Sequence, residues 1–307
     1  MSTTQDVAYH MGGVPVHGVF TTGSVFFVSS VTGSDGNTGK KPTQAFATLD
    51  KATNACTANK NDIVYIMPNH AETIAGATTW VPDVAGVQYI GVGLGADAPE
   101  LTFSATGSII PVSGGNNLFK NIRFVAGISA IVMGVDVLAS HVTFDGCVWD
   151  FGASGYDFIK MLECDSFDYM TVKNCRFIAQ NATAGADMAI HLDASDHVVI
   201  QDNLFSGDFA FSVIASKTTD AAGVSTMILD NNIYNDDADT TNAGAIALAC
   251  AFTGIISGNK LGTLSTGVAA DPGGIGIDPG SCLMFENYVC TQIDHYGVIS
   301  LTGTATT

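Results

Sequence analysis

Apolar and polar residues alternate in short blocks that recur along the chain from about residue 120 onward. Each block has a central residue, an apolar residue three positions before it and another two positions after it. The central residues lie 25 to 29 positions apart and are Ile122, Cys147, Cys175, Asn203, Asn232, Asn259 and Asn287. The apolar residues before them are Phe119, Phe144, Val172, Ile200, Leu229, Ile256 and Met284, and those after them are Phe124, Trp149, Phe177, Phe205, Tyr234, Leu261 and Val289. A period of two predicts β-strands, and no long period of 3.6 residues competes with it.

A fixed repeat of this length predicts a stacked architecture in which equivalent residues form columns. Successive coils would lie ~4.8 Å apart, so each apolar column becomes a row of like side chains in the core. The central asparagines can then hydrogen-bond one above another, as stacked amides do. Cys147 and Cys175 fill the same column in earlier coils, which indicates interior packing rather than reactive thiols.

These blocks resemble those of right-handed parallel β-helix proteins of the pectin-lyase-like superfamily, over about residues 25–300. The resemblance implies an all-β fold, a single-stranded right-handed parallel β-helix of about nine coils of ~28 residues. A glycine-rich loop at 33–39 and an amphipathic segment at 45–58 match the first coil of such proteins, where a helix covers the open end of the core. Phe46, Leu49 and Ala52 lie on one face of this expected helix.

The same loop does not fit a phosphate-binding P-loop. Gly33 and Gly39 are separated by five residues instead of four, and Lys40 is followed by Lys41 where a hydroxyl residue is needed. We therefore expect a cap and no required cofactor.

We expect the chain to consist of an N-terminal attachment arm at 1–24 and one β-helix domain at 25–307. The N-terminus lacks a basic region followed by an apolar core, so we expect no secretory signal and synthesis in a cytoplasm. Seven cysteines without a CxxC pair indicate reduced thiols.

The net charge of the chain and its small number of basic residues limit the kinds of molecule that it is expected to bind. The chain of 307 residues has a formal charge of −18 and 11 basic residues, and Arg123 and Arg176 are its two arginines. Nucleic-acid binding needs clustered Lys and Arg, so it is not expected, and the same deficit disfavours acidic polysaccharides. The apolar run at 240–259 contains asparagines and glycines in the register of the repeat, so no membrane span is expected.

Three functions are compatible with this fold, because a β-helix alone does not determine function. A polysaccharide lyase or glycoside hydrolase would need paired acids around a sugar. Asp150, Asp157 and Asp208 are candidates that no motif connects, so no catalytic residue is assigned. A carbohydrate-binding tail adhesin would need exposed aromatic residues, for which Tyr156, Phe158, Phe167 and Tyr169 are candidates, whereas Trp149 belongs to an interior column.

The third function follows from a resemblance to small β-helix structural proteins of tailed phages. It implies a non-enzymatic virion component, either a capsid decoration (cement) protein or a short spike. Such a protein would bind the major capsid protein or another virion protein through the arm and form a homotrimer, and it could contact a surface glycan. We favour this interpretation, which places the protein in the virion.

One cluster of acidic residues is a candidate metal site. When the repeat is aligned, Asp165 lies against Asp193 and Asp168 against Asp196, each pair one coil apart, ~5 Å. No Lys or Arg occurs at 161–172 or 187–200. The four carboxylates either cap backbone N–H groups in solvated turns or together bind Ca²⁺, which takes six to eight oxygen ligands.

Overall fold

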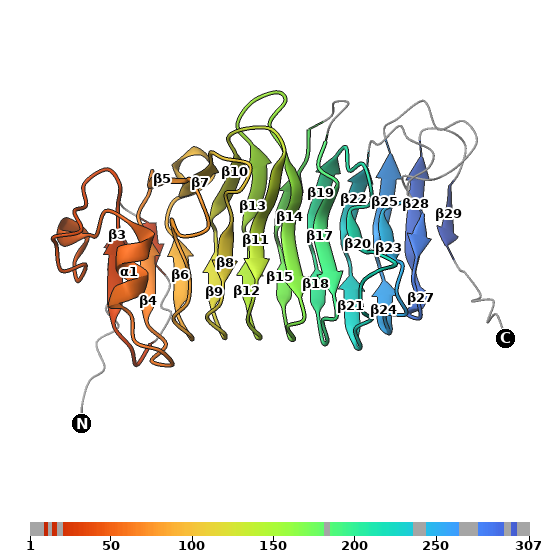
Figure 1. Ribbon diagram of the computed structural model, residues 1–307, viewed down its shortest axis with the longest axis horizontal. Coiled ribbons are helices and arrows are strands. Elements are labelled where there is room, and N and C mark those ends of the chain that lie inside the picture. The colour runs from red at the N-terminus through yellow and green to blue at the C-terminus, as the bar shows by residue number, and fades with distance from the viewer. Residues whose placement is uncertain are drawn as a thin grey trace.

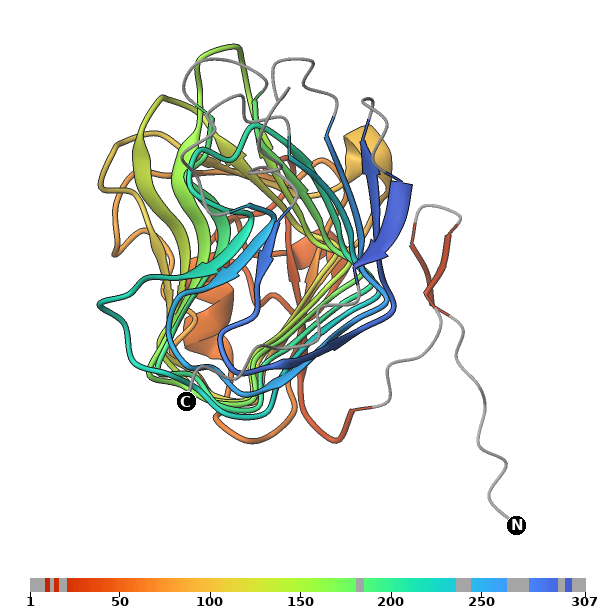
Figure 2. The same cartoon turned by 90° about the vertical axis from the view of Figure 1, so that its right-hand side faces the viewer.

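Successive coils of the chain contribute strands to three mainly parallel sheets that enclose an apolar core, and the coils stack into a rod (Figure 1). The computed structural model describes residues 9–11, 14–16, 21–180, 185–235, 244–263, 276–291 and 296–299. Figure 2, viewed along the rod, shows the three sheets around the core. The expected parallel β-helix is confirmed.

We name the sheets I, II and III in the order in which the chain enters them. Sheet I contains β3 (Val25–Val28), β4 (Ile63–Ile66), β6 (Gln88–Gly91), β9 (Leu118–Lys120), β12 (Thr143–Asp145), β15 (Thr171–Lys173), β18 (Val199–Gln201), β21 (Thr226–Leu229), β24 (Gly254–Ser257) and β27 (Leu283–Phe285). Sheet II contains β5 (Ala71–Ile74), β7 (Glu100–Phe103), β10 (Arg123–Ala126), β13 (Val148–Phe151), β16 (Arg176–Ile178), β19 (Leu204–Gly207), β22 (Asn232–Asn235), β25 (Lys260–Thr263), β28 (Asn287–Thr291) and β29 (Tyr296–Ile299). Sheet III contains β8 (Ile110–Val112), β11 (Ile131–Val137), β14 (Phe158–Asp165), β17 (Met188–Asp193), β20 (Ile214–Ser216), β23 (Ile246–Leu248) and β26 (Ile277–Asp278).

The coil count is lower than the nine coils expected from the repeat. Within the described residues, sheet III has seven strands, so seven coils carry a strand in all three sheets, whereas sheets I and II have ten strands each. The parallel order also ends within sheet II, because β29 pairs antiparallel with β28.

A short helix covers the N-terminal end of the core, as expected, but it is shorter than the predicted segment at 45–58. It comprises α1 (Leu49–Ala55), preceded by the 3₁₀ turn η1 (Pro42–Gln44). The Thr48 side chain accepts a hydrogen bond from the Lys51 N–H and caps the helix N-terminus. Phe46, Leu49 and Ala52 are buried in the core. No helix in the described part of the chain has the length and hydropathy needed to cross a bilayer.

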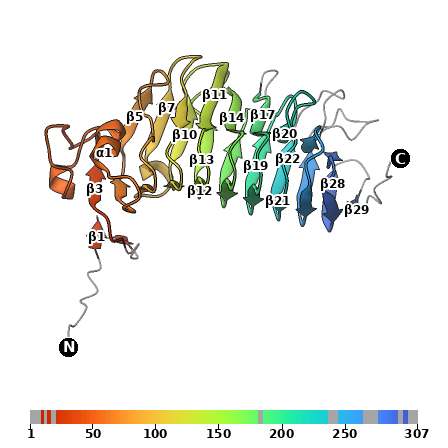
Figure 3. The same cartoon turned by 60° about the horizontal axis from the view of Figure 1, so that its bottom comes forward.

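The N-terminal hairpin stands apart from the three sheets. β1 (Tyr9–Met11) and β2 (Val14–Val16) pair antiparallel and form a separate two-stranded sheet. Figures 2 and 3 show this hairpin beside the rod rather than within a coil. The rest of the predicted arm up to residue 20 lies outside the described residues.

The two predicted apolar columns are correct in most coils. In the column after the central residues, Trp149 is fully buried, and its ring stacks between Phe124 and Phe177 at centroid distances of 4.8 and 4.5 Å. Phe205 continues the stack at 4.9 Å from Phe177. Cys147 and Cys175 are buried, as expected of interior packing.

The alignment is wrong by one residue in the coil that contains Asn231 and Asn232. The side chain of Asn231, not Asn232, joins the buried amide column. The core positions are therefore Ile228 and Ile233, and the predicted Leu229 and Tyr234 face outward. A shift of one residue along a strand exchanges its inner and outer faces, so the residues predicted for both apolar columns are wrong in this coil.

The corrected amide column links four coils. Each Nδ2 donates to the Oδ1 of the next asparagine 28 residues later, from Asn203 to Asn231, Asn259 and Asn287, at 2.9–3.0 Å. The residue before each of these asparagines has a positive φ, which makes the tight turn from sheet I to sheet II. The buried amides satisfy one another and backbone groups of neighbouring coils, as burial of polar groups requires.

Candidate functional site

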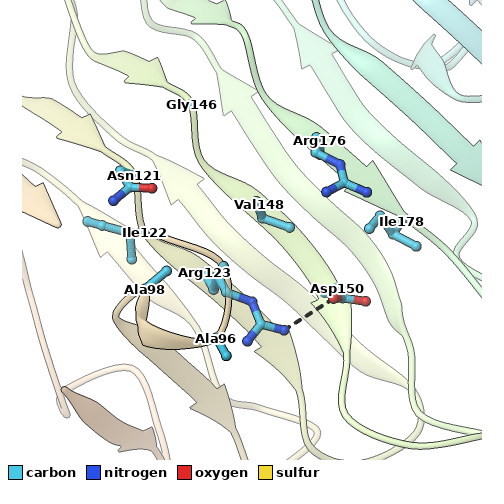
Figure 4. A pocket seen from close by; sticks show the side chains of 11 residues that line it. Ala96, Ala98, Asn121, Ile122, Arg123, Gly146, Val148, Asp150, Arg176 and Ile178 are labelled. Carbon is cyan, nitrogen blue, oxygen red and sulfur yellow. Dashed lines mark hydrogen bonds and ion pairs between the residues drawn. The ribbon is translucent and has the colours of Figure 1, made fainter. Parts of the chain in front are cut away.

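A pocket of about 430 Å³ lies over sheet II and contains both arginines of the chain (Figure 4). Its floor comes from three successive coils, in β10, β13 and β16. A loop that contains the 3₁₀ turn η2 (Gly95–Asp97) overhangs one side and contributes Ala96 and Ala98. The pocket is therefore built from outward-facing strand residues and one surface loop.

Strand register brings the two arginines into one row. Arg123 pairs with Val148, and Val148 pairs with Arg176, so the arginines stand two coils apart, ~10 Å along the row. Figure 4 shows Val148 between their side chains. Each arginine directly follows the central residue of its block, so the repeat places both at one strand position, but it does not predict the overhanging loop.

The two guanidinium groups have different surroundings. Arg123 bonds to Glu100 Oε2 at 2.8 Å and to Asp150 Oδ2 at 3.3 Å, so two carboxylates hold it in place. Arg176 is exposed and makes no hydrogen bond or ion pair with the residues that the structure describes. The free positive charge of the pocket is therefore that of Arg176.

A second cluster of charged residues lies on the outer face of sheet III. His191 Nδ1 is 2.5 Å from Glu163 Oε1, and His191 Nε2 is 2.8 Å from Asp220 Oδ2. Lys160 Nζ donates to the same Glu163 oxygen at 2.5 Å. Register brings Asp136 beside Glu163 on the neighbouring strand. The side chains of Glu163 and His191 are almost entirely buried.

The two neighbouring carboxyl groups differ in pKa. Burial raises the pKa of Asp136 to about 6, together with the negative charges of Glu163 and Asp165. Burial also raises the pKa of Glu163, but hydrogen bonds and charges from His191 and Lys160 outweigh it and hold this pKa below its ordinary value. Around pH 6, Asp136 is therefore protonated in roughly half of the molecules, while the neighbouring Glu163 is ionised.

Sequence reasoning missed this cluster, although part of it was visible. Glu163 and His191 are 28 residues apart, which is the repeat length, so alignment of the coils could have found the pair. Asp220 is 29 residues beyond His191 and comes from a loop of different length, so the repeat does not place it.

Two of the predicted metal ligands, Asp165 and Asp193, are the last residues of β14 and β17, and Asp168 and Asp196 lie in the turns that lead from these strands to sheet I. Asp165 and Asp193 pair in register, as expected. The Asp168 carboxylate accepts a hydrogen bond from the Asp196 N–H at 3.1 Å, so these two residues are also neighbours. The carboxylates of Asp193 and Asp196 accept from the backbone N–H groups of Ala221 and Val224 in the next coil.

These bonds are those expected of turn-capping aspartates. Within the described residues, no group of three or more His, Cys, Asp or Glu side chains is arranged to hold a metal ion. The Ca²⁺ site at Asp165, Asp168, Asp193 and Asp196 stays a prediction.

The candidate aromatic patch for sugar binding does not form. Phe158 is buried in the core, and Phe167 packs against it, whereas Tyr156 and Tyr169 are exposed. The Tyr169 ring stacks between His141 and His197, with 4.5 Å between centroids on each side. Both faces of the ring are covered, so Tyr169 offers no platform to a sugar.

The other candidate acids do not assemble into one site. Asp150 lies in the pocket over sheet II, whereas the Asp157 carboxylate accepts a hydrogen bond from the Ala130 N–H in the previous coil. Asp208 lies two coils beyond Asp150 along the chain.

Comparisons with known proteins do not assign the chain to a family. No protein-family model and no curated protein matches the sequence. Among solved structures, a rhamnogalacturonan lyase is similar over 86% of this chain and 87% of its own chain, with a TM-score of 0.43 and 11% sequence identity. Similarity at this level supports no statement about activity.

Proposed function

We propose that the protein is a non-enzymatic structural component of a virus particle, a capsid decoration protein or short spike of the tailed-phage kind, attached through its N-terminal arm. The observation that carries the proposal is the separate β1–β2 hairpin. It pairs with itself and with none of the three sheets in the described part of the chain. The rod is capped by α1 without it, and this leaves the hairpin as the element through which we propose that the protein binds a partner such as the major capsid protein.

Deletion of residues 2–20 tests this function. We expect the truncated protein to keep the circular dichroism spectrum and melting temperature of the full chain, because the core begins at β3. It should fail to co-sediment with purified particles that lack the protein. A chain that lacks residues 301–307 is the control for loss of a terminal segment. Undiminished co-sedimentation after removal of 2–20 would rule out attachment through the arm.

We also propose that copies associate through the outer face of sheet I into a homotrimer. One outer row of this sheet, from Leu118 through Thr143, Thr171, Val199, Met227 and Ile255 to Leu283, contains no charged residue. Because each copy carries a formal charge of −18, copies meet at lower electrostatic cost along this uncharged row, in which five of the seven residues are apolar.

Hydrolysis of a polysaccharide is a second candidate function, favoured by the carboxyl pair of sheet III. Asp136 and Glu163 are neighbours whose pKa values are shifted in opposite directions, as in acid and base pairs of glycosidases. Asp136 would donate a proton and Glu163 would act as the ionised partner. Release of reducing ends from a panel of polysaccharides, lost in Asp136→Asn, would support it. If the wild type releases no reducing ends from any polysaccharide of the panel, hydrolysis is excluded as its function.

A further inference from the structure

We propose that residues 300–303 add a further strand to sheet I, paired antiparallel with β27, so that the chain covers the last edge of its own rod. The structure describes this edge and the strand β29 that leads to it, whereas residues 300–303 lie beyond the described part of the chain. The pairing involves the end of the rod opposite to α1 and does not depend on the function proposed above (Figure 1).

The backbone of the last coil lacks a partner that earlier coils have. β27 is the last strand of sheet I and pairs on one side with β24. The corner residue before each asparagine of the amide column donates its N–H to the following coil, as Asp202 does to the Leu229 carbonyl at 3.2 Å and Asp230 to the Ser257 carbonyl at 3.0 Å. Glu286 is the equivalent residue of the last coil, and no acceptor for its N–H occurs among the described residues.

The side chains of β27 are also less well covered than those of earlier strands. Leu283 and Phe285 are exposed on the outer face. Met284 occupies a core position but is only partly buried, whereas its equivalents Ile228 and Ile256 are fully buried. An unpaired strand edge is a template for pairing with further backbone, so natural proteins commonly cover such edges.

β29 brings the chain back to this edge. It runs antiparallel to β28 in a constant register that ends with Ile299 opposite Asn287. Asn287 lies at the corner between sheets I and II, two residues after the end of β27, so β29 ends beside this strand. Continuation of the register past the corner places Leu301 opposite Phe285, with both side chains on the same face of the sheet.

Charge and composition favour this segment over a second copy as the partner of β27. Residues 300–307 contain four threonines, no proline and no charged side chain, and β-branched residues suit a strand. Asp278 and Glu286 are exposed acids at this end of the rod. A second copy would bring the same acids and a formal charge of −18 to the contact. The chain's own segment brings no such charge and is already tethered beside the edge.

Amide hydrogen exchange of the full chain, followed by NMR, tests the pairing. The N–H groups of Glu286 and of Met284, two positions before it, face the edge and should exchange slowly in the wild type. Thr302→Pro should accelerate both by about tenfold or more, because proline removes a backbone donor and disfavours a strand that pairs on that side. The N–H groups of Ile228 and Ile256 should be unaffected and show that the core is intact.

Thr306→Pro is the matched control, because it introduces the same residue into the same segment beyond the positions opposite β27. It should leave the exchange of Met284 and Glu286 unchanged. Fast exchange of these groups in the wild type, slow exchange in all three proteins, or equal acceleration by the two prolines would overturn the pairing. Slow exchange that depends on protein concentration would show that a second copy covers the edge and would also overturn it.

Discussion

Ile228 and Leu229 are adjacent apolar residues of β21 whose side chains lie on opposite sides of sheet I. Ile228 is fully buried between Ile200 and Ile256, whereas Leu229 is only partly buried. We expect Ile228→Asp to lower the free energy of unfolding by about 4 kcal/mol, because an unpaired charge would be buried in the core. Leu229→Asp should cost less than about 1 kcal/mol.

Chemical unfolding of the two variants, side by side with the wild type, measures this difference. The pair is closely matched, since both introduce the same charge into the same strand. Equal destabilisation by both substitutions would contradict the corrected register.

Asp136 gives a pH-dependent prediction at the same scale. Its pKa rises from 3.8 to about 6 in the folded protein, so ionisation is less favourable in the folded chain than in the unfolded one. The resulting loss of stability is absent at low pH, grows between about pH 4 and 6, and is constant above. Asp136→Asn should therefore raise the free energy of unfolding by about 1 kcal/mol at pH 7, after allowance for solvent screening, and by much less at pH 4.

Asp145 is the contrasting residue. Burial raises its pKa, but hydrogen bonds from Asn174 and Lys120 outweigh burial and lower the pKa below the ordinary value. Its stabilising effect is present near neutral pH and is lost in acid as the carboxylate is protonated. Asp145→Asn should destabilise the protein at pH 7 by up to about 1 kcal/mol. Shifts of the same sign in Asp136→Asn and Asp145→Asn would refute this account.

At the scale of elements, the sequence predicted the strands well where a single alignment fits them. Across Asn231 and Asn232 two alignments fit, because Ile228 and Leu229 are both apolar, as are Ile233 and Tyr234. Apolar pattern alone cannot choose between them. The correct alignment is identified by the constant 28-residue spacing of the stacked asparagines. A buried amide needs a hydrogen-bond partner at the equivalent position of the next coil, and Asn231 provides it.

The functional elements were less predictable than the strands. The repeat places Arg123 and Arg176, but the loop at 92–99 that overhangs them is longer than the equivalent turns in the next coils, so the repeat does not predict it. The same holds for Asp220, which reaches His191 from a loop outside the 28-residue spacing. Both candidate sites thus depend on loop residues that the repeat does not predict, whereas the residues of the core follow from the repeat.

The prediction of bound Ca²⁺ concerns the ends of β14 and β17 and the turns that follow them. Asp165 and Asp193 stand side by side without a basic residue near them in sequence, so a divalent cation would relieve their repulsion. If it binds, millimolar Ca²⁺ should raise the melting temperature by about 2–4 °C over chelator, because it binds the folded state alone. The double change of Asp165 and Asp193 to Asn should abolish the shift.

Asp202→Asn is the control for that experiment, since Asp202 is an exposed acid in a turn outside the stack. It should leave the Ca²⁺ shift intact. Coincident melts of the wild type with chelator and with Ca²⁺ would leave the four aspartates as backbone caps only.

At the scale of the whole molecule, charge and shape act together. A rod with a formal charge of −18 resists self-association over most of its surface. Two apolar side chains of the uncharged row of sheet I are exposed, Met227 by 39% and Leu283 by 70%. Trimers that bury this row would remove its apolar groups from water.

Met227→Glu tests the proposed trimer, because it puts a like charge at the centre of each copy's contact. We expect sedimentation velocity to show trimers for the wild type and monomers for this variant, with unchanged melting of the monomer because Met227 lies outside the core. Val132→Glu is the control, since Val132 is 52% exposed on β11 of sheet III and should not affect assembly. A monomeric wild type at about 50 μM, a concentration at which a stable interface of ordinary affinity is occupied, or trimers that survive Met227→Glu, would exclude this face as the contact.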